Sequence, residues 1–548
     1  MVQLMGLLGP TTPGTLTSNS LSLPILSIIL FLPLAGALLI SFLNDERQIK
    51  VASVVVVALD FVLAMFVLAD FKFDTHTWVF QFHDKYNWVS ALGITYWLGV
   101  DGISVFLVGL TTLIVGIGVI AANYMIAERL KVFLMLMLSL QTAVLGVFMS
   151  LNLFLFFVFW EAMLIPTYFL IGVWGEERRV YATLKFLLYT IFGSFLMLVG
   201  IFYLWSQRGT LDMAGPNGLI AHPVSSSAQI WLFLAFGMAF AIKIPIWPFH
   251  TWAPTAYTES PIPVVVVVAG VLSKAGAFGF LRYCLPLFPS ASRQLAALLS
   301  VLCVIGMLYA AVLALVQTDI KRLVAYASIS HMNLLALGIF AYNNTSIDGT
   351  VLQMINHSVI ITGLFLAVGF ISARTGTRML PDLGGLGIKR PILMWVFFVF
   401  ILAGLDLPGL NSFSGEFLIL VGVFKANAWY ASVAALTVIL AAWYMIRFFQ
   451  NTMNGPITVS SQQVAEGGES TEEPERTVYQ YPVLRRLIPG DLRLNELGLL
   501  IPLMVLIFYI GLQPDSLTTR MNPTTGPLST LVQTAGPGNG TPSVGGGR

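Results

Sequence analysis

Long apolar runs alternate with short polar segments along almost the whole chain of 548 residues. A helix that crosses the hydrocarbon core of a bilayer needs roughly 20 apolar residues. By this measure the pattern predicts an all-α polytopic membrane protein with about 14 transmembrane helices. The predicted spans are 24–43, 51–70, 98–122, 132–149, 151–172, 183–205, 229–250, 263–283, 294–316, 322–340, 349–373, 392–424, 428–450 and 495–513.

The spacing of the polar segments divides the chain into six parts. The C-terminal tail is rich in Thr, Pro and Gly, a composition typical of disorder. The expected parts are 1–129 (spans one to three with an external loop), 130–283 (spans four to eight), 294–450 (spans nine to thirteen), 451–494 (a polar cytoplasmic loop), 495–513 (the last span) and 514–548 (a disordered external tail).

Lys and Arg gather in every second loop. Cytoplasmic loops of membrane proteins carry an excess of these residues. We therefore expect both termini on the external, periplasmic side of a bacterial inner (plasma) membrane. The basic loops hold Arg47 and Lys50; Arg129 and Lys131; Arg178 and Arg179; Lys321 and Arg322; Arg374, Arg378, Lys389 and Arg390; and Arg476, Arg485, Arg486 and Arg493.

Composition supports lipid as the solvent and excludes several function classes. The chain is 57% hydrophobic and 10% charged, whereas soluble domains carry roughly 25% charged residues. Its net charge of +2 indicates no nucleic-acid partner. An iron–sulfur cluster needs about four thiolates, but the chain has only Cys284 and Cys303. We expect no cofactor and no metal in this chain.

Ionisable residues stand near the centres of several predicted spans. A charge at a helix centre costs roughly 2.5–3.5 kcal/mol on insertion scales, so such residues face a protein interior or water. A structural salt bridge is the alternative for the Glu and Lys residues, and a histidine bonded to a carbonyl is the alternative for the two His residues. Asp60 is also mid-span, without a role that its context suggests. The candidate proton-relay residues are Glu161, Lys243, Lys274, His331, His357 and Glu416.

Helix breakers accompany the charges in two spans. Proline removes a donor and clashes with the carbonyl four residues earlier, so Pro245 and Pro248 are expected to free the carbonyls of Ala241 and Ile244 beside Lys243. Pro408 interrupts a later span before Glu416. Interrupted segments in corresponding positions of two halves are typical of inverted repeats with a site between them.

The two breaks therefore predict that 130–283 and 294–450 are inverted five-helix repeats, each with a broken helix. A buried lysine loses its charge by desolvation and keeps it beside a carboxylate. Movement of Glu161 toward Lys243 then holds a proton on that lysine, and its withdrawal releases the proton toward Lys274.

Between Leu98 and Phe449 the chain resembles the antiporter-like subunits of respiratory complex I. Among these it is most similar to the chain M type of bacterial NADH–quinone oxidoreductase, the counterpart of mitochondrial subunit 4. Glu416, where sister subunits carry lysine, favours this type, as do WEAMLIPTY and the absence of a long lateral helix after the last span. The motifs are LGVDGIS, FWEAMLIPTYFLIG, KFLLYTIFGS, FAIKIPIWPFHTWAP, LSKAGAFGFLR, TDIKRLVAYASISHMN and LPGLNSFSGEF.

The resemblance implies a role for each candidate. Glu161 is similar to the essential glutamate that pairs with Lys243, and Lys274 to the central connecting lysine. His331 and His357 are similar to members of the second half-channel, and Glu416 to the exit-side residue. After His250 the chain reads HTWAPTAY where relatives often read HTWLPDAH, so we assign no role to Thr255 or Tyr257.

The resemblance also implies partners and alternatives. FMN, iron–sulfur clusters and quinone are expected in partner subunits, and neighbouring membrane-arm subunits and the lipid bilayer are the expected contacts. The chain is then part of an enzyme, NADH:quinone oxidoreductase, only through its complex. An Mrp-type multisubunit cation/proton antiporter subunit is the alternative, and a scaffold that does not pump is a third hypothesis. Copurifying flavin and iron–sulfur chains would distinguish the first from the second.

Overall fold

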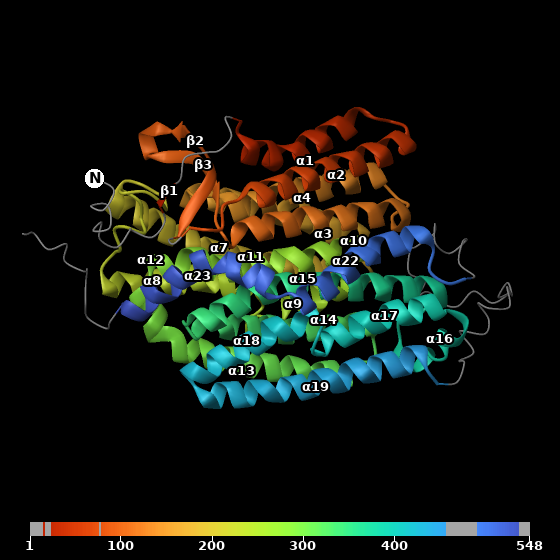
Figure 1. Ribbon diagram of the computed structural model, residues 1–548. Helices are drawn as coiled ribbons and strands as arrows, with labels where there is room; N and C mark the ends of the chain where they lie inside the picture. The colour runs from red at the N-terminus through yellow and green to blue at the C-terminus, as the bar shows by residue number, and fades with distance from the viewer. Residues whose placement is uncertain (1–14, 17–22, 76–77, 456–489, 536–548) are drawn as a thin grey trace, which may run out of the picture.

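The computed structural model describes residues 15–16, 23–75, 78–455 and 490–535. Within these ranges the chain forms a bundle of long helices that lie side by side, with a small sheet at one end (Figure 1). Thirteen helices or continuous helical runs are long and apolar enough to cross a membrane. A broken pair, α17 and α18, takes the place of the twelfth predicted span, so the prediction of about 14 crossings is confirmed.

The helix bounds follow the predicted spans closely. The first part contains α1 (Ile25–Phe42), α2 (Glu46–Asp70), α3 (Ser104–Met125), α4 (Leu130–Met149), α5 (Leu153–Ala162), α6 (Leu164–Trp174), α7 (Arg179–Arg208), α8 (Ser226–Lys243) and α9 (Trp252–Glu259). The second contains α13 (Pro289–Val316), α14 (Ile320–Phe340), α15 (Asn344–Thr375), α16 (Leu386–Lys389), α17 (Pro391–Gly404), α18 (Asn411–Ala426), α19 (Ala428–Met453), α22 (Leu494–Leu512) and α23 (Asp515–Thr534).

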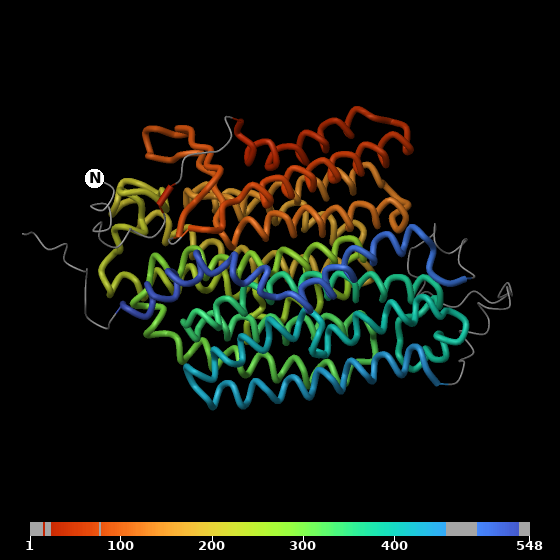
Figure 2. Tube along the Cα trace, in the orientation of Figure 1, coloured from red at the N-terminus to blue at the C-terminus, as the bar shows by residue number. Residues whose placement is uncertain are grey.

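A fully buried run connects these two groups. It consists of α10 (Ile262–Val267), the π-helical turn η2 (Val268–Leu272), α11 (Ser273–Gly279), a second π-helical turn η3 (Phe280–Cys284) and α12 (Leu285–Leu287). Figure 2 shows the order of the chain: α1 to α4 lie on one side of the bundle, α13 and α19 lie on the other, and α22 returns to the middle. There Arg374 of α15 makes a buried ion pair with Glu496 of α22, 2.5 Å between Nη2 and Oε2.

A hairpin precedes α3, where the sequence suggested that a span already begins. Strand β2 (Val79–Val89) pairs antiparallel with β3 (Ile94–Val100), and β1 (Thr15–Leu16) adds a short parallel pairing. The helix begins at Ser104, and just before it the Asp101 carboxylate accepts hydrogen bonds from the amides of Ile103 and Ser104. Such a side-chain cap satisfies amides that a helix start leaves free.

The expected disordered tail is wrong for residues 515–534. They form α23, which packs against the ends of α15 and α13. Met521, Leu528 and Val532 are buried and lie on one helical face, because they are spaced by seven and four residues. Gln533 Nε2 also donates to the Tyr342 carbonyl at 2.7 Å. The polar loop 451–494 lies mostly outside the described residues, as do positions 536–548 of the tail.

Helix α8 ends at Lys243, as Pro245 and Pro248 predicted. The carbonyls near this end are bonded differently from the prediction. The Ala241 carbonyl accepts a hydrogen bond from Ile246 N at 2.9 Å, and the Ile242 carbonyl accepts one from the Trp252 indole at 2.8 Å. The expected free carbonyl at Ala241 is therefore wrong. The chain turns within the break and uses an amide five residues on, which satisfies the backbone inside the bundle.

Candidate proton relay

Glu161 lies in the last turn of α5, one residue after a buried tryptophan. Its side chain is half-buried, and its Oε1 atom accepts no hydrogen bond from the described residues. The neighbouring Trp160 indole donates to Ser194 Oγ of α7 at 3.2 Å. The helix is interrupted just after Glu161, at Met163, before α6 begins. One oxygen of the Glu161 carboxylate is therefore free of hydrogen bonds from the described residues, beside an interruption of the helix.

Lys243 is the last residue of α8 and is 1% exposed. Its Nζ atom has no hydrogen-bond partner among the described residues, and lies 5.2 Å from the ring centroid of Trp160 and 5.6 Å from that of Phe186. An ammonium over aromatic faces gains a cation–π attraction that partly replaces hydration.

The structure thus brings Lys243 Nζ within 5.2 Å of the ring centroid of Trp160, the residue that precedes Glu161. Among the described ion pairs none of 4.0 Å or less joins Lys243 to Glu161. Glu161 and Lys243 are therefore near each other in the bundle but do not form a direct ion pair in this structure.

Lys274 lies at the centre of the fully buried run, in α11 between the two π-helical turns. Its Nζ atom lies 2.7 Å from His357 Nδ1 of α15 and donates to the Ala269 carbonyl at 2.8 Å. π-helical segments interrupt the regular hydrogen-bond ladder and are frequent at functional sites. Here the turn η2 supplies a carbonyl for the lysine, so the side chain is held against His357.

His331 and Glu416 lie next to the contact between Lys274 and His357. The rings of His357 and His331 are 5.9 Å apart between centroids. On α14, His331 Nδ1 lies 2.6 Å from Glu416 Oε1 of α18, and Gln353 Nε2 donates to the same oxygen at 2.9 Å. The structure therefore places Lys274, His357, His331 and Glu416 in one continuous series across four helical elements. Glu161 and Lys243 form a separate group.

Asp406 was missed by the sequence analysis and lies in this series. It occupies the break between α17 and α18, and its carboxylate, the carboxylate of Glu416 and a ring nitrogen of His331 lie within 4.8 Å of one another. The signal was present in the sequence, because a charged residue next to a helix-breaking proline, Pro408, is the pattern that identified Lys243.

A further group of charges lies at the basic end of the bundle, the end that carries the Arg- and Lys-rich loops. Lys321 Nζ is 2.7 Å from Glu176 Oε1, and Arg378 pairs with both Glu176 and Asp319. Burial raises the pKa of Asp319, and the positive charges of Arg378 and Lys321 oppose that rise. These pairs tie the start of α14 to the loops after α6 and α15.

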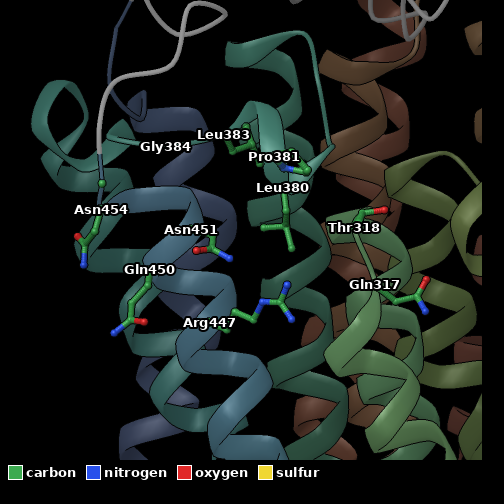
Figure 3. A pocket seen from close by; sticks show the side chains of 11 residues that line it. Gln317, Thr318, Leu380, Pro381, Leu383, Gly384, Arg447, Gln450, Asn451 and Asn454 are labelled. Atoms are coloured by element: carbon green, nitrogen blue, oxygen red, sulfur yellow. The ribbon is translucent and has the colours of Figure 1, made fainter.

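A pocket of about 360 Å³ opens at the same end (Figure 3). Arg447, Gln450, Asn451 and Asn454 come from α19 and the residue after it, opposite Gln317 and Thr318 of the turn between α13 and α14. None of the six predicted relay residues lines this pocket. It is therefore distinct from the buried series of side chains.

Comparisons with known proteins place this geometry in a family context. The family model described as NADH:quinone oxidoreductase/Mrp antiporter, TM, matches residues 150–441. NADH-quinone oxidoreductase subunit M of Rickettsia prowazekii is 38% identical over 503 residues, which are 91% of this chain and 97% of the relative. The same-named protein of Mycobacterium tuberculosis is 36% identical over an alignment that covers 95% of this chain and 96% of the relative.

Solved structures give the same picture. A chain of respiratory complex I from Thermus thermophilus superposes with a TM-score of 0.79 at 30% identity, covering 92% of this chain and 99% of that one. A chain of the Mrp complex from Dietzia sp. DQ12-45-1b has a TM-score of 0.78 over 94% of this chain and 100% of that one, but only 19% identity. The second likeness shows a shared fold alone.

Proposed function

Because the chain belongs to the NADH:quinone oxidoreductase/Mrp antiporter transmembrane family, we propose that it is a proton-translocating membrane-arm subunit of complex I, of the subunit M type. Relatives at 38% and 36% identity carry that name over nearly their whole length. The Mrp alternative has weaker support, since the similarity to the Mrp complex is in fold at 19% identity.

One observation carries the proposal: two buried contacts, Lys274 to His357 at 2.7 Å and His331 to Glu416 at 2.6 Å, lie end to end in the interior. Ionisable groups are rare within membrane spans and mark ion pathways when they contact one another. In this series each proton acceptor stands beside the next. A proton on Lys274 can pass to His357, reach His331 and arrive at Glu416.

Glu161 and Lys243 act as the switch that loads the series. When Glu161 approaches Lys243, the ammonium is stabilised by the opposite charge; when Glu161 withdraws, the desolvated lysine releases its proton. The aromatic faces of Trp160 and Phe186 lie beside the Lys243 nitrogen and favour its charged form, the ammonium. The energy for this movement comes from quinone reduction elsewhere in the complex, in partner subunits that hold FMN, iron–sulfur clusters and quinone.

The architecture extends the proposal. One broken pair, α8 and α9, lies in the segment 130–283, and the other, α17 and α18, lies in the segment 294–450. This placement supports the interpretation of the two segments as inverted repeats. Basic loops gather at one end of the bundle, and β1 and the last turn of α23 lie at the other (Figure 1). By the excess of positive charge, the basic end faces the bacterial cytoplasm and both termini face the periplasm.

A topology measurement checks this orientation. A small epitope added at either terminus should be cleaved by a protease added to the outside of spheroplasts, since both ends are proposed to be external. A matched epitope in the loop 456–489 should be protected until the membrane is permeabilised. Protection of a terminal epitope, or cleavage of the loop epitope in intact spheroplasts, would contradict the orientation.

Substitution of Glu416 tests the last step of the relay. Glu416→Ala removes the acceptor for His331 and for Gln353, so proton-translocating turnover of the assembled complex should fall by about tenfold or more. Glu416→Asp keeps a carboxylate and should retain a larger part of the rate. The measurement is NADH-driven acidification of inverted membrane vesicles, and equal, near-normal rates for both variants would reduce Glu416 to a structural role.

A further inference from the structure

Asp406 has a left-handed backbone conformation, which most residues with a side chain rarely adopt. Its φ is +61°, in the left-handed region. Glycine adopts this region freely, and Asn and Asp tolerate it better than other residues. A glycine would close the same turn between α17 and α18 without a charge, yet the chain carries a carboxylate there that is 7% exposed. The turn itself does not require that carboxylate.

The carboxylate of Asp406 lies close to the side chains of Glu416, His331 and Ser412. Both of its oxygens are buried without a hydrogen-bond partner among the described residues. Its neighbours are the carboxylate of Glu416 and the ring of His331, with one ligand atom of each group within 4.8 Å of the others. The Gln353 Oε1 atom, on the helix that packs against α18, is also buried without a donor.

Two buried carboxylates this close repel each other strongly when both are ionised. Something positive must lie between them, either a proton or another cation. Glu416 Oε1 already lies in hydrogen-bond contact with His331 Nδ1 at 2.6 Å and with Gln353 Nε2 at 2.9 Å. His331 and Glu416 therefore already contact each other directly through Nδ1 and Oε1. A hydrogen shared between the two carboxyls leaves this contact in place, and we favour it over a metal ion for that reason.

We propose that Asp406 and Glu416 share one proton and that Asp406 is a further proton-carrying residue of the relay. This inference rests on the proposed translocation function. In the loading step the N–H bond of protonated His331 breaks and an O–H bond forms on Glu416, so the imidazole becomes neutral. The charge of the carboxyl pair changes from −2 to −1. In the release step the O–H bond breaks and the proton passes to water. The pair returns to −2 as His331 takes up the next proton from His357, so a positive imidazolium again lies beside the two carboxylates.

Two substitutions at Asp406 separate the carboxylate from the turn. Asp406→Asn and Asp406→Gly both suit a φ of +61°, so both variants keep the backbone. We expect each to lower NADH-driven proton translocation of the complex in inverted vesicles by about tenfold or more. Electron transfer from NADH to a water-soluble acceptor should stay normal, which reports assembly of the peripheral enzyme. Wild-type translocation in both variants would overturn the proposal.

A double-mutant cycle with Glu416→Gln distinguishes a shared proton from two independent roles. If the two carboxyls hold one proton, the double variant should be no slower than Glu416→Gln alone, since residues that act as a unit are not additive. A multiplicative loss in the double variant would overturn the sharing. If Glu416→Gln has no effect, the proposed relay itself fails; if it impairs translocation and Asp406→Asn does not, only this inference fails.

A titration with Na⁺ tests whether a cation other than a proton lies between the carboxylates of Asp406 and Glu416. The translocation rate of wild type should not depend on Na⁺ concentration when ionic strength is held constant with choline. A rate that rises with Na⁺ in wild type and loses that dependence in Asp406→Asn would place Na⁺ between the carboxylates and contradict the shared proton.

Discussion

Glu161→Gln should reduce NADH-driven proton translocation in inverted membrane vesicles by about tenfold or more. Glutamine keeps the shape of the side chain but cannot change the charge state of Lys243. That lysine is buried without a hydrogen-bond partner among the described residues, and an opposite charge nearby favours the charged form of a buried amine. The measurement is the initial rate of vesicle acidification on addition of NADH.

Glu128→Gln is the matched control. Glu128 is an exposed glutamate in the loop between α3 and α4, away from the buried series, and its substitution should leave the rate unchanged. Electron transfer to a water-soluble acceptor should be normal in both variants. A Glu161→Gln complex that acidifies vesicles as fast as the control would remove Glu161 from the switch.

Lys274→Met should slow quinone reduction by NADH by a factor similar to the loss of proton translocation in Glu161→Gln, for a different reason. Methionine approximates the length of lysine, so the core around α11 stays filled, but His357 loses the proton donor that lies 2.7 Å from its Nδ1 atom. We expect quinone reduction by NADH to fall by about tenfold or more, because electron transfer is coupled to proton movement.

Lys425→Met serves as the comparison for Lys274. Lys425 is an exposed lysine near the end of α18 whose contact is a hydrogen bond to Thr345 Oγ1 at 3.3 Å. Its loss should not slow quinone reduction. Similar rates in the two lysine variants would mean that Lys274 braces α11 against α15 and carries no proton.

The sequence was sufficient for the spans and for locating the buried ionisable residues within them. Apolar runs of about 20 residues identify a crossing whatever its neighbours, because every backbone polar group in lipid must be paired within the helix. A charge such as Lys274 in an otherwise apolar run is equally conspicuous, because its burial requires partners. Its particular partner, His357, lies 83 positions away and becomes evident only when α11 and α15 are packed together.

Residues outside the spans were harder to predict. The tail 514–548 has the composition of a disordered segment, but Met521, Leu528 and Val532 find a surface on the bundle and order α23. That surface is built by distant helices, so composition alone could not reveal it. Asp406, by contrast, lies inside the predicted span 392–424, and its charge beside Pro408 was visible in the sequence. Its proximity to Glu416 and His331 becomes evident only when α14, α17 and α18 are packed together.

The central claim is that the buried acids and bases carry protons and do not merely hold helices together. The number of protons moved per NADH oxidised, measured in proteoliposomes that contain the purified complex, tests it most directly. In a complex that carries both Lys243→Met and Lys274→Met, we expect fewer protons to be moved per NADH oxidised than in wild type. This result is expected even if NADH oxidation itself is slower. A wild-type ratio at wild-type turnover in that complex would contradict the relay.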